Sequence, residues 1–484
     1  MKLFTLKHLL AASLIGALSL IPLSSSADDI KLPELSDSTS GIVSPEKEYV
    51  LGRTWLKAFR SQTKEYFDPI VQQYVENLIN HIARYSELND KRLEITMVDN
   101  PTMNAFAVPG GVVGVHTGLF GHAENEHQIA SVFAHELAHL SQRHFARRMA
   151  EQKKSTITTM AGLLAGLVLA ATADGDAGIA ALTASQALAM DQQLRYSRQN
   201  EQEADRIGIE TLYKAGMDPA AAPAMFERML RAGRFSGSRL PEFLRTHPLT
   251  EKRVADARNR LEKYPVKSYS DNIDYHLNKA RIRLHMDKNP QKSIIFFRSE
   301  LDGHSISEEA ARYGLMIALM QAGQYSEAEK ELAVLKKQSN HLYYSLAEIE
   351  LERAKGNFEL AEQLNHQKLL FHPNDYPLQM ALAETFLKAK RYGDSDKVLT
   401  AVSRQRPTDP YVWYELAEVR GLAGNIAGVH TARAEYFILV GAFSMARDHL
   451  DQALKLTQHD FKQTSIIRQR MIELAELEEQ IEKL

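Results

Sequence analysis

The sequence predicts two unlike parts: a mostly helical α+β domain that contains a small β-sheet, followed by an all-α solenoid of paired helices. Short segments with strand character lie between residues 93 and 115, and apolar residues at helical spacing surround them. In the second part, a glycine-plus-aromatic signature returns at intervals close to 34 residues, which is typical of stacked helical hairpins. We therefore expect a first domain of residues 46–263, a linker of residues 264–273 and a repeat domain of residues 274–484.

Composition and charge limit the classes of function. The chain has 484 residues, 44% of them apolar, so it can bury the cores of two or three domains. Its formal net charge of −3 offers no electrostatic argument for binding nucleic acid or an anionic membrane surface. Because the chain has no cysteine, it has no disulfide and no cysteine that could carry a lipid. Partners must therefore be inferred from particular sites.

The first 27 residues have the pattern of a secretory signal peptide. Two lysines precede an apolar run from Leu9 to Leu23, and small residues follow it. This run is short for a membrane span of about 20 residues, which favours cleavage after Ala27 over an uncleaved anchor. A polar leader of residues 28–45 comes next. We expect a soluble periplasmic protein with no transmembrane segment in its mature form.

The helices and strands around the expected sheet can be placed from periodicity. Residues 46–86 carry apolar and aromatic side chains at helical spacing and predict two or more helices. Residues 93–98 alternate with period two and predict a strand. Residues 104–115 are rich in β-forming residues but include Pro109 and three glycines, which is typical of an edge strand with a tight turn. Such an edge could hold an extended peptide, and a purely structural hairpin fits the same residues.

A helix over residues 125–149 carries the most informative motif of the chain, HELAH at residues 135–139. On a helix, the i and i+4 side chains share a face, so His135 and His139 can bind one metal ion while Glu136 faces its water. In zinc hydrolases, three protein ligands hold the ion and a fourth position stays open for water. The motif therefore predicts a zincin-like metalloprotease domain with one Zn²⁺ ion per subunit.

His144 is one candidate for the third ligand. It lies five residues after His139, but the metzincin pattern requires glycine at position 142 and histidine at position 145. This chain has Gln142 and Phe145 there. We therefore expect His144 to be a surface or helix-end histidine and not a ligand.

Glu201 is the better candidate, on a helix expected over residues 198–215. Asp205 lies four residues further on, on the same helical face, and could accept a hydrogen bond from the free N–H of a ligand histidine. A solvated acidic helix face is the structural alternative for this pair. Glu203 points away from that face and is expected at the surface.

Two further segments leave alternatives open. Residues 156–190 are rich in Ala, Gly, Leu and Thr and fit a buried helical hairpin, a lid over the active-site cleft or a contact with a membrane surface. His247 precedes Pro248 and could donate a hydrogen bond to the tetrahedral intermediate, or it could fill the open position of the zinc as a fourth ligand and keep the enzyme idle. A loop histidine at the start of a helix is its structural alternative.

The C-terminal part repeats one signature, glycine followed two residues later by an aromatic or apolar residue, with one degraded copy at Tyr392 that lacks the preceding glycine. Tyr325, Phe358, Tyr392, Ile426 and Phe443 are separated by 33, 34, 34 and 17 residues. The first three intervals match a 34-residue helix-turn-helix repeat, and the last matches half a repeat. The array resembles tetratricopeptide repeats, which implies a concave groove that binds proteins.

Three segments of the first domain together resemble the gluzincin peptidases of the CAAX-prenyl-protease and HtpX type. They are residues 104–111, the HELAH motif and residues 197–205, and the resemblance covers about residues 46–263. The resemblance implies zinc ligands at His135, His139 and Glu201, a general base and acid at Glu136, an orienting carboxylate at Asp205, and contacts to the substrate backbone from Asn104, Gly110 and Gly111.

The signal peptide, the peptidase region and the repeats together resemble periplasmic members of this family. That resemblance implies a zinc endopeptidase that degrades misfolded or stalled outer-membrane proteins and supports the assembly of outer-membrane β-barrels. It also implies that the repeats bind the β-barrel assembly machinery. A chaperone or scaffold on that machinery, with proteolysis secondary, is the alternative.

Overall fold

The computed structural model describes residues 44–151, 198–235 and 241–482. The predicted signal peptide and almost all of the polar leader lie outside the described residues, as does the segment 156–190 with its three alternative roles. No helix within the described ranges has both the length and the apolar character needed to cross a membrane.

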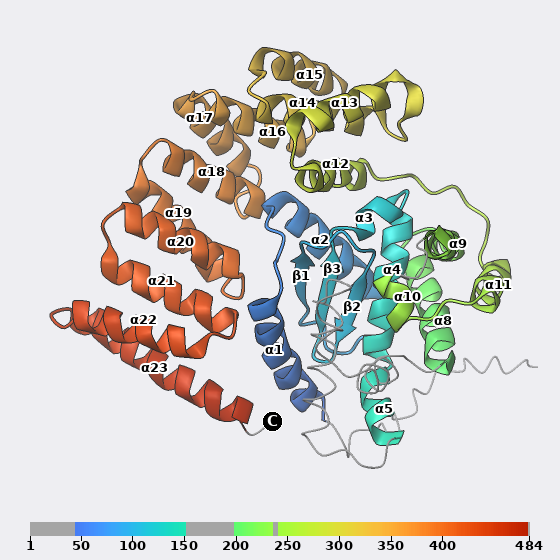
Figure 1. Ribbon diagram of the computed structural model, residues 1–484, viewed down its shortest axis with the longest axis horizontal. Helices are drawn as coiled ribbons and strands as arrows, with labels where there is room; N and C mark the ends of the chain where they lie inside the picture. Colours follow the sequence, from blue (N-terminus) through green and yellow to red (C-terminus); the bar gives the residue numbers. More distant parts are fainter. Residues whose placement is uncertain (1–43, 152–197, 236–240, 483–484) are drawn as a thin grey trace, which may run out of the picture. The chain divides into compact units, whose positions relative to one another are not determined.

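The first domain consists mainly of helices around one small sheet (Figure 1). As predicted, residues 46–86 form two helices, α1 (Pro45–Gln62) and α2 (Pro69–Tyr85). Each begins with proline, which needs no hydrogen-bond acceptor there, after an N-cap side chain that accepts a backbone N–H. The other helices are α3 (Leu119–His122), α4 (Glu126–Ser141), α5 (His144–Glu151), α8 (Arg198–Lys214), α9 (Ala221–Phe235), α10 (Glu242–Thr246) and α11 (Glu251–Arg260), with a 3-10 turn at Leu261–Lys263.

Three strands form the sheet of this domain, in the order β1-β3-β2. β1 (Glu94–Val98) runs parallel to β3 (Val112–His116), and β2 (Ala105–Val108) forms an antiparallel hairpin with β3. Gly110 and Gly111 form the turn with φ values of +82° and +81°, which explains why both are glycine. β3 is the central strand and β1 and β2 lie at the two edges, so the predicted edge strand is the first arm of the hairpin.

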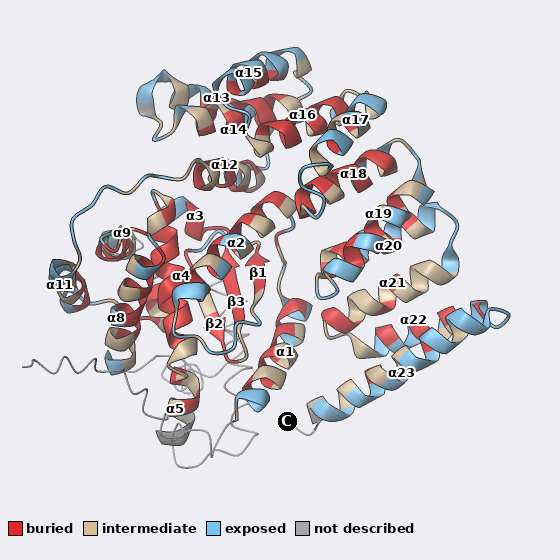
Figure 2. Ribbon diagram, turned by 180° about the vertical axis from the view of Figure 1, so that it is seen from behind, coloured by how far each residue is buried: buried red, intermediate tan, exposed pale blue. Residues whose placement is uncertain are grey.

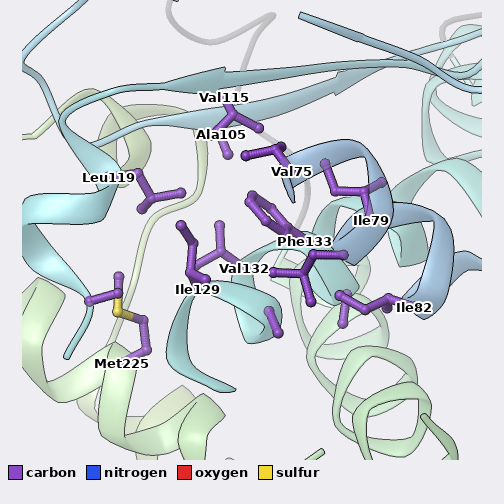
Figure 3. Packing of buried hydrophobic residues seen from close by; sticks show 14 of the residues in the cluster. Val75, Ile79, Ile82, Ala105, Val115, Leu119, Ile129, Val132, Phe133 and Met225 are labelled. Atoms are coloured by element: carbon purple, nitrogen blue, oxygen red, sulfur yellow. The ribbon is translucent and has the colours of Figure 1, made fainter. Parts of the chain in front are cut away.

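The core of the domain lies between the sheet and helices α2 and α4. Figure 3 shows Ile129, Val132 and Phe133 of α4 pointing toward Ala105 and Val115 of the sheet. All of them are at most 2% exposed. As a result α4 is buried along almost its entire length (Figure 2), which fixes the position of the HELAH motif that it carries.

The helix predicted over residues 125–149 is wrong in one respect, because it is broken after Ser141. The backbone N–H groups of Gln142 and Arg143 still bond to α4, but Arg143 has a φ of +49°, in the left-handed region. A right-handed helix cannot continue through that conformation, so α5 starts in a new direction at His144. The break changes what His144 can reach.

The second part is a series of helices in which each packs against the next (Figure 1). An irregular stretch of residues 265–272 precedes it. Its helices are α12 (Ile273–Asp287), α13 (Pro290–Ser299), α14 (Glu308–Gln321), α15 (Tyr325–Gln338), α16 (Leu342–Ala354), α17 (Phe358–Leu369), α18 (Tyr376–Lys388), α19 (Tyr392–Gln405), α20 (Pro410–Leu422), α21 (Ile426–Leu439), α22 (Phe443–Leu456) and α23 (Phe461–Glu482), with a π-type turn at Glu300–His304.

The predicted repeat signature coincides with the helix starts. Each of the five aromatic or apolar signature residues is the first residue of a helix, namely of α15, α17, α19, α21 and α22. The residue two positions earlier has a left-handed backbone in every case. Four of these residues are glycine, and the fifth is Lys390 with a φ of +61°. The tight turn therefore persists in the repeat that lacks its glycine.

A cluster of charged groups joins the repeat helices to the first domain. Arg281 of α12 lies 2.7 Å from Asp68, the N-cap residue of α2, and 3.0 Å from Glu350 of α16. Its guanidinium also donates to the hydroxyl of Tyr313. These three charged side chains are each at most 15% exposed, so loss of the cation would leave two poorly hydrated carboxylates close together.

We therefore expect Arg281→Met to lower the free energy of unfolding by about 3 kcal/mol, because it keeps the aliphatic bulk and removes the charge. Denaturant unfolding of the full chain measures this loss. Arg298→Met is the matched control, since Arg298 and Glu327 form an ion pair in which both side chains are at least half exposed, and its loss is expected to cost less than about 1 kcal/mol. Equal effects of the two substitutions would contradict this account of Arg281.

Candidate metal centre

The HELAH motif lies in the second half of α4, which is a well-defined helix. Asn125 caps its N-terminus by accepting a hydrogen bond from the backbone N–H of Gln128. His135, Glu136 and His139 are 2%, 0% and 3% exposed, respectively. Polar side chains buried to this extent need partners, and the partners come from α8 and from the end of α10.

Four side chains converge on one point, namely those of His135, His139, Glu201 and His247. Each offers one donor atom for a metal, and these atoms all lie within 4.8 Å of one another. The two Nε2 atoms of His135 and His139 are 3.1 Å apart. Lone pairs that face one another inside a protein repel unless a proton or a metal ion lies between them, and three imidazoles with one carboxylate are a donor set that zinc prefers. The residues present therefore fit a zinc ion.

Glu201 reaches this point because α8 approaches α4 very closely. A Cβ atom placed on Gly208 of α8 would lie only 3.2 Å from the backbone nitrogen of His135. Glycine at this position therefore permits the close contact between the two helices. Glu201 Oε2 lies 3.5 Å from His135 Nε2, and Glu201 Oε1 lies 3.6 Å from His139 Nε2.

Asp205 of α8 lies on the far side of His135 from the convergence point. Its Oδ1 atom is 3.1 Å from His135 Nδ1, and Arg253 of α11 donates two hydrogen bonds of 2.7 Å to the same carboxylate. Arg253 also lies 2.8 Å from Glu201. The acidic pair is thus buried and ion-paired, so the alternative of a solvated acidic face does not hold. No pattern in the sequence indicates that Arg253, 48 residues away from Asp205, reaches both carboxylates.

The charges of this group shift several pKa values. Burial opposes the charge on His135, but its interactions with Asp205 and Glu201 outweigh burial and raise its pKa to about 9. Burial and the neighbouring His135 hold the pKa of His139 well below its usual range. Burial alone would raise the pKa of Glu201, yet the surrounding histidines hold it well below its usual range. Without a metal, the site therefore keeps a proton on His135.

Glu136 lies beside the convergence point and not in it. Its carboxylate is fully buried, with one oxygen 3.4 Å from His247 Nε2. Burial raises the pKa of Glu136, and the charges of His247 and His135 oppose that rise. A carboxylate whose proton affinity is increased in this way is suited to accept and return a proton near neutral pH.

His247 is the C-cap residue of α10 and is 2% exposed. Its ring stacks on Phe243, and its Nδ1 lies 3.4 Å from His135 Nε2 and 3.1 Å from Glu201 Oε1. An ordinary loop histidine would not be held among two metal-ligand candidates. The structure places His247 where a fourth ligand would lie.

The residues expected to hold the substrate backbone lie along the β2–β3 hairpin. Asn104 precedes β2, is 3% exposed, and its side-chain oxygen has no hydrogen-bond partner among the described residues. Gly110 and Gly111 form the hairpin turn and pack against α1 and the start of β1. A cavity of about 120 Å³ lies beside them, and Ala107 of the edge strand and His139 also line it.

Two residues that the sequence placed at the surface belong to the surroundings of the site. His144 is fully buried, and its Nδ1 lies 2.9 Å from His139 Nδ1. Its Nε2 lies 3.2 Å from Glu203, so Glu203 is also not a free surface carboxylate. The break after α4 causes both differences, because it turns His144 back toward His139. As expected, His144 is not among the four converging groups.

Comparison with known proteins agrees with this geometry. Residues 69–261 match the sequence profile of "Peptidase family M48". The beta-barrel assembly-enhancing protease of Escherichia coli (strain K12) is 34% identical over 93% of this chain and 91% of its own length, and that of Yersinia pestis is 32% identical over 87% of each. The mitochondrial metalloendopeptidase OMA1 of Schizosaccharomyces pombe is 32% identical over 43% of this chain and 60% of its own.

The chain therefore belongs to peptidase family M48. It is a metalloendopeptidase whose buried metal site comprises His135, His139, Glu201 and His247. A solved tetratricopeptide repeat protein from Parabacteroides merdae covers 52% of the chain at 14% identity with a TM-score of 0.27.

The proton on His135 predicts how metal binding depends on pH. Because zinc must displace this proton below about pH 9, the apparent zinc affinity should rise about tenfold per pH unit between pH 6 and 8. Competition with a chromophoric chelator measures the affinity.

Asp205→Asn serves as the comparison, because it removes one of the interactions that raise the pKa of His135. In this variant the increase of zinc affinity with pH should level off at a lower pH than in the wild type. A wild-type affinity that does not change between pH 6 and 8 would contradict the assignment.

Proposed function

We propose that the protein is a zinc-dependent endopeptidase that acts on unfolded protein segments in the periplasm. The observation that carries this proposal is the convergence of four buried donor atoms with Glu136 beside them. Peptide hydrolysis by a zinc enzyme requires an acidic side chain next to the metal position that takes up water, and here that position would open when His247 withdraws. In the proposed organisation, residues 46–263 form the peptidase domain and residues 274–484 form the repeat domain.

His135, His139 and Glu201 would hold the ion, which when bound polarises the scissile carbonyl and acidifies a water molecule. Glu136 takes a proton from the attacking water and returns it to the leaving amine, a role that its raised pKa supports. Asp205, itself fixed by Arg253, keeps the Nδ1 proton of His135 in place so that Nε2 remains available.

The edge of β2 supports the binding of an extended peptide. β2 pairs with β3 along one side. Along its other side, β2 has no strand partner among the described residues. A peptide added there would pass the cavity that Ala107 and His139 line. Asn104, Gly110 and Gly111 would then contact its backbone, with alternate side chains facing the cavity.

The choice of substrate follows from the relatives and from the repeats. Proteins that are similar along nearly the whole chain are named beta-barrel assembly-enhancing proteases. We infer that misfolded or stalled outer-membrane proteins are the substrates and that the repeat domain binds the β-barrel assembly machinery. The signal-peptide pattern of residues 1–27 supports export to the periplasm.

His247 would act as a fourth ligand that occupies the water position in the resting enzyme. Its nitrogen lies among the other donors and its ring is buried against Phe243, which supports gating over a role limited to the tetrahedral intermediate. For water to enter, His247 must withdraw from this position.

The first test of the enzyme is Glu136→Gln. We expect it to reduce degradation of an unfolded outer-membrane protein by at least about 100-fold while zinc content stays at one ion, because the general base is lost and the ligands are kept. Chelation of zinc from the wild type should abolish degradation as well. If the Glu136→Gln variant retains every cellular function, the scaffold alternative takes precedence.

The test of gating is His247→Ala. Removal of a ligand that occupies the water position should raise the rate of peptide cleavage several-fold, because the water position is open in every molecule. A fall in rate would favour a role at the tetrahedral intermediate, and an unchanged rate would exclude both roles. Steady-state cleavage of a fluorogenic peptide by the full chain provides the measurement.

A further inference from the structure

A series of polar groups lies behind the metal site, on the side of His139 that faces away from the convergence point. His139 directs Nε2 toward His135 and Glu201. Its other nitrogen, Nδ1, lies 2.9 Å from Nδ1 of His144. The two rings meet edge to face, with centroids 4.8 Å apart and an angle of 75° between their planes.

The positions of the protons follow from this geometry. If Nε2 of His139 binds a metal, its lone pair is used there and Nδ1 must carry the proton. That N–H is placed to donate to Nδ1 of His144, which accepts it when this nitrogen is unprotonated. The proton of a neutral His144 then lies on Nε2, which is 3.2 Å from Glu203 Oε2 and can donate to it.

This series of polar groups ends in a cation. Arg147 donates to the same oxygen of Glu203 at 2.9 Å, and it lies one turn after His144 on α5. His139, His144, Glu203 and Arg147 thus form a continuous series in which each donor meets an acceptor. His135 has a similar series on the opposite side of the site, through Asp205 to Arg253.

We propose that His144 is a positioning residue that holds the tautomer and ring orientation of the zinc ligand His139. The left-handed backbone of Arg143 interrupts the helix between the two histidines, and His144 contacts His139 across this break. His144 itself does not bind the ion. Its nitrogen takes the place that a carboxylate oxygen of Asp205 takes for His135.

This inference rests on the proposed zinc site, so the experiment measures zinc affinity directly and does not depend on peptidase activity. Full-length wild type and variants are stripped of metal and titrated with zinc in competition with a chromophoric chelator. His144→Asn keeps an acceptor oxygen close to the position of Nδ1, whereas His144→Leu keeps bulk and removes the acceptor. Thermal unfolding of the metal-free proteins monitors the fold.

We expect His144→Leu to weaken zinc binding about 10- to 100-fold and His144→Asn to stay within about threefold of wild type. The absorption spectrum of the cobalt-substituted protein should change in the Leu variant and remain close to wild type in the Asn variant. Equal losses of zinc affinity in the two variants would show that His144 contributes only packing, and would overturn the proposal. No loss in either would also overturn the proposal.

A second pair of variants is independent of the packing around His144. Glu203 is 28% exposed, so Glu203→Gln should fold normally and weaken zinc binding a few-fold, since it removes the charged acceptor at the end of the series. Glu210→Gln is the matched control, because Glu210 lies on the same helix and forms an ion pair with the exposed Lys214, away from the metal site. Equal affinities of these two variants would overturn the proposed series. If wild type itself binds no zinc, the proposed function fails along with this inference.

Discussion

The close contact between α4 and α8 is the constraint on which the rest of the site depends. Gly208 allows the backbone of α8 to lie against α4 at His135. Because of this contact, a single helix can supply a carboxylate to each face of His135, Glu201 on one side and Asp205 on the other. The two histidines come from one helix and need only their spacing, but the carboxylates need the second helix at this distance. A side chain at position 208 would be in tight contact with the backbone of α4 at Ala134 and His135.

Charge balance inside this contact explains why the surroundings are also polar. Two carboxylates buried side by side would repel one another, and Arg253 offsets this by contacting both. The site thus has a fixed cation on the side opposite to the metal position. Both histidines are in turn supported from behind, and both supporting series end in an arginine. These polar and charged contacts therefore connect four helices, α4, α5, α8 and α11.

The sequence predicted the parts of this arrangement that are local and missed those that are not. Helical spacing determines how His135 and His139 lie, and the 34-residue period determines where the repeat helices start, so both could be predicted. Arg253 reaches Asp205 through the tertiary fold, and no pattern in one sequence encodes such a distance. His144 was misplaced for a different reason. Helical propensity continues through residues 142 and 143, so the break that turns His144 inward depends on one left-handed residue, Arg143, which is not a glycine.

One further set of contacts connects α10, next to His247, with the loop before the edge strand β2. The short helix α10, which carries His247, is attached to the loop that starts the edge strand. The backbone N–H of Phe243 donates to the carbonyl oxygen of Met103, and Thr102 donates to Glu242. A displacement of α10 would therefore act on Met103, two residues before β2 begins at Ala105. If a peptide binds along the strand edge as proposed, thermodynamic reciprocity requires that its binding and the position of His247 influence each other by the same free energy.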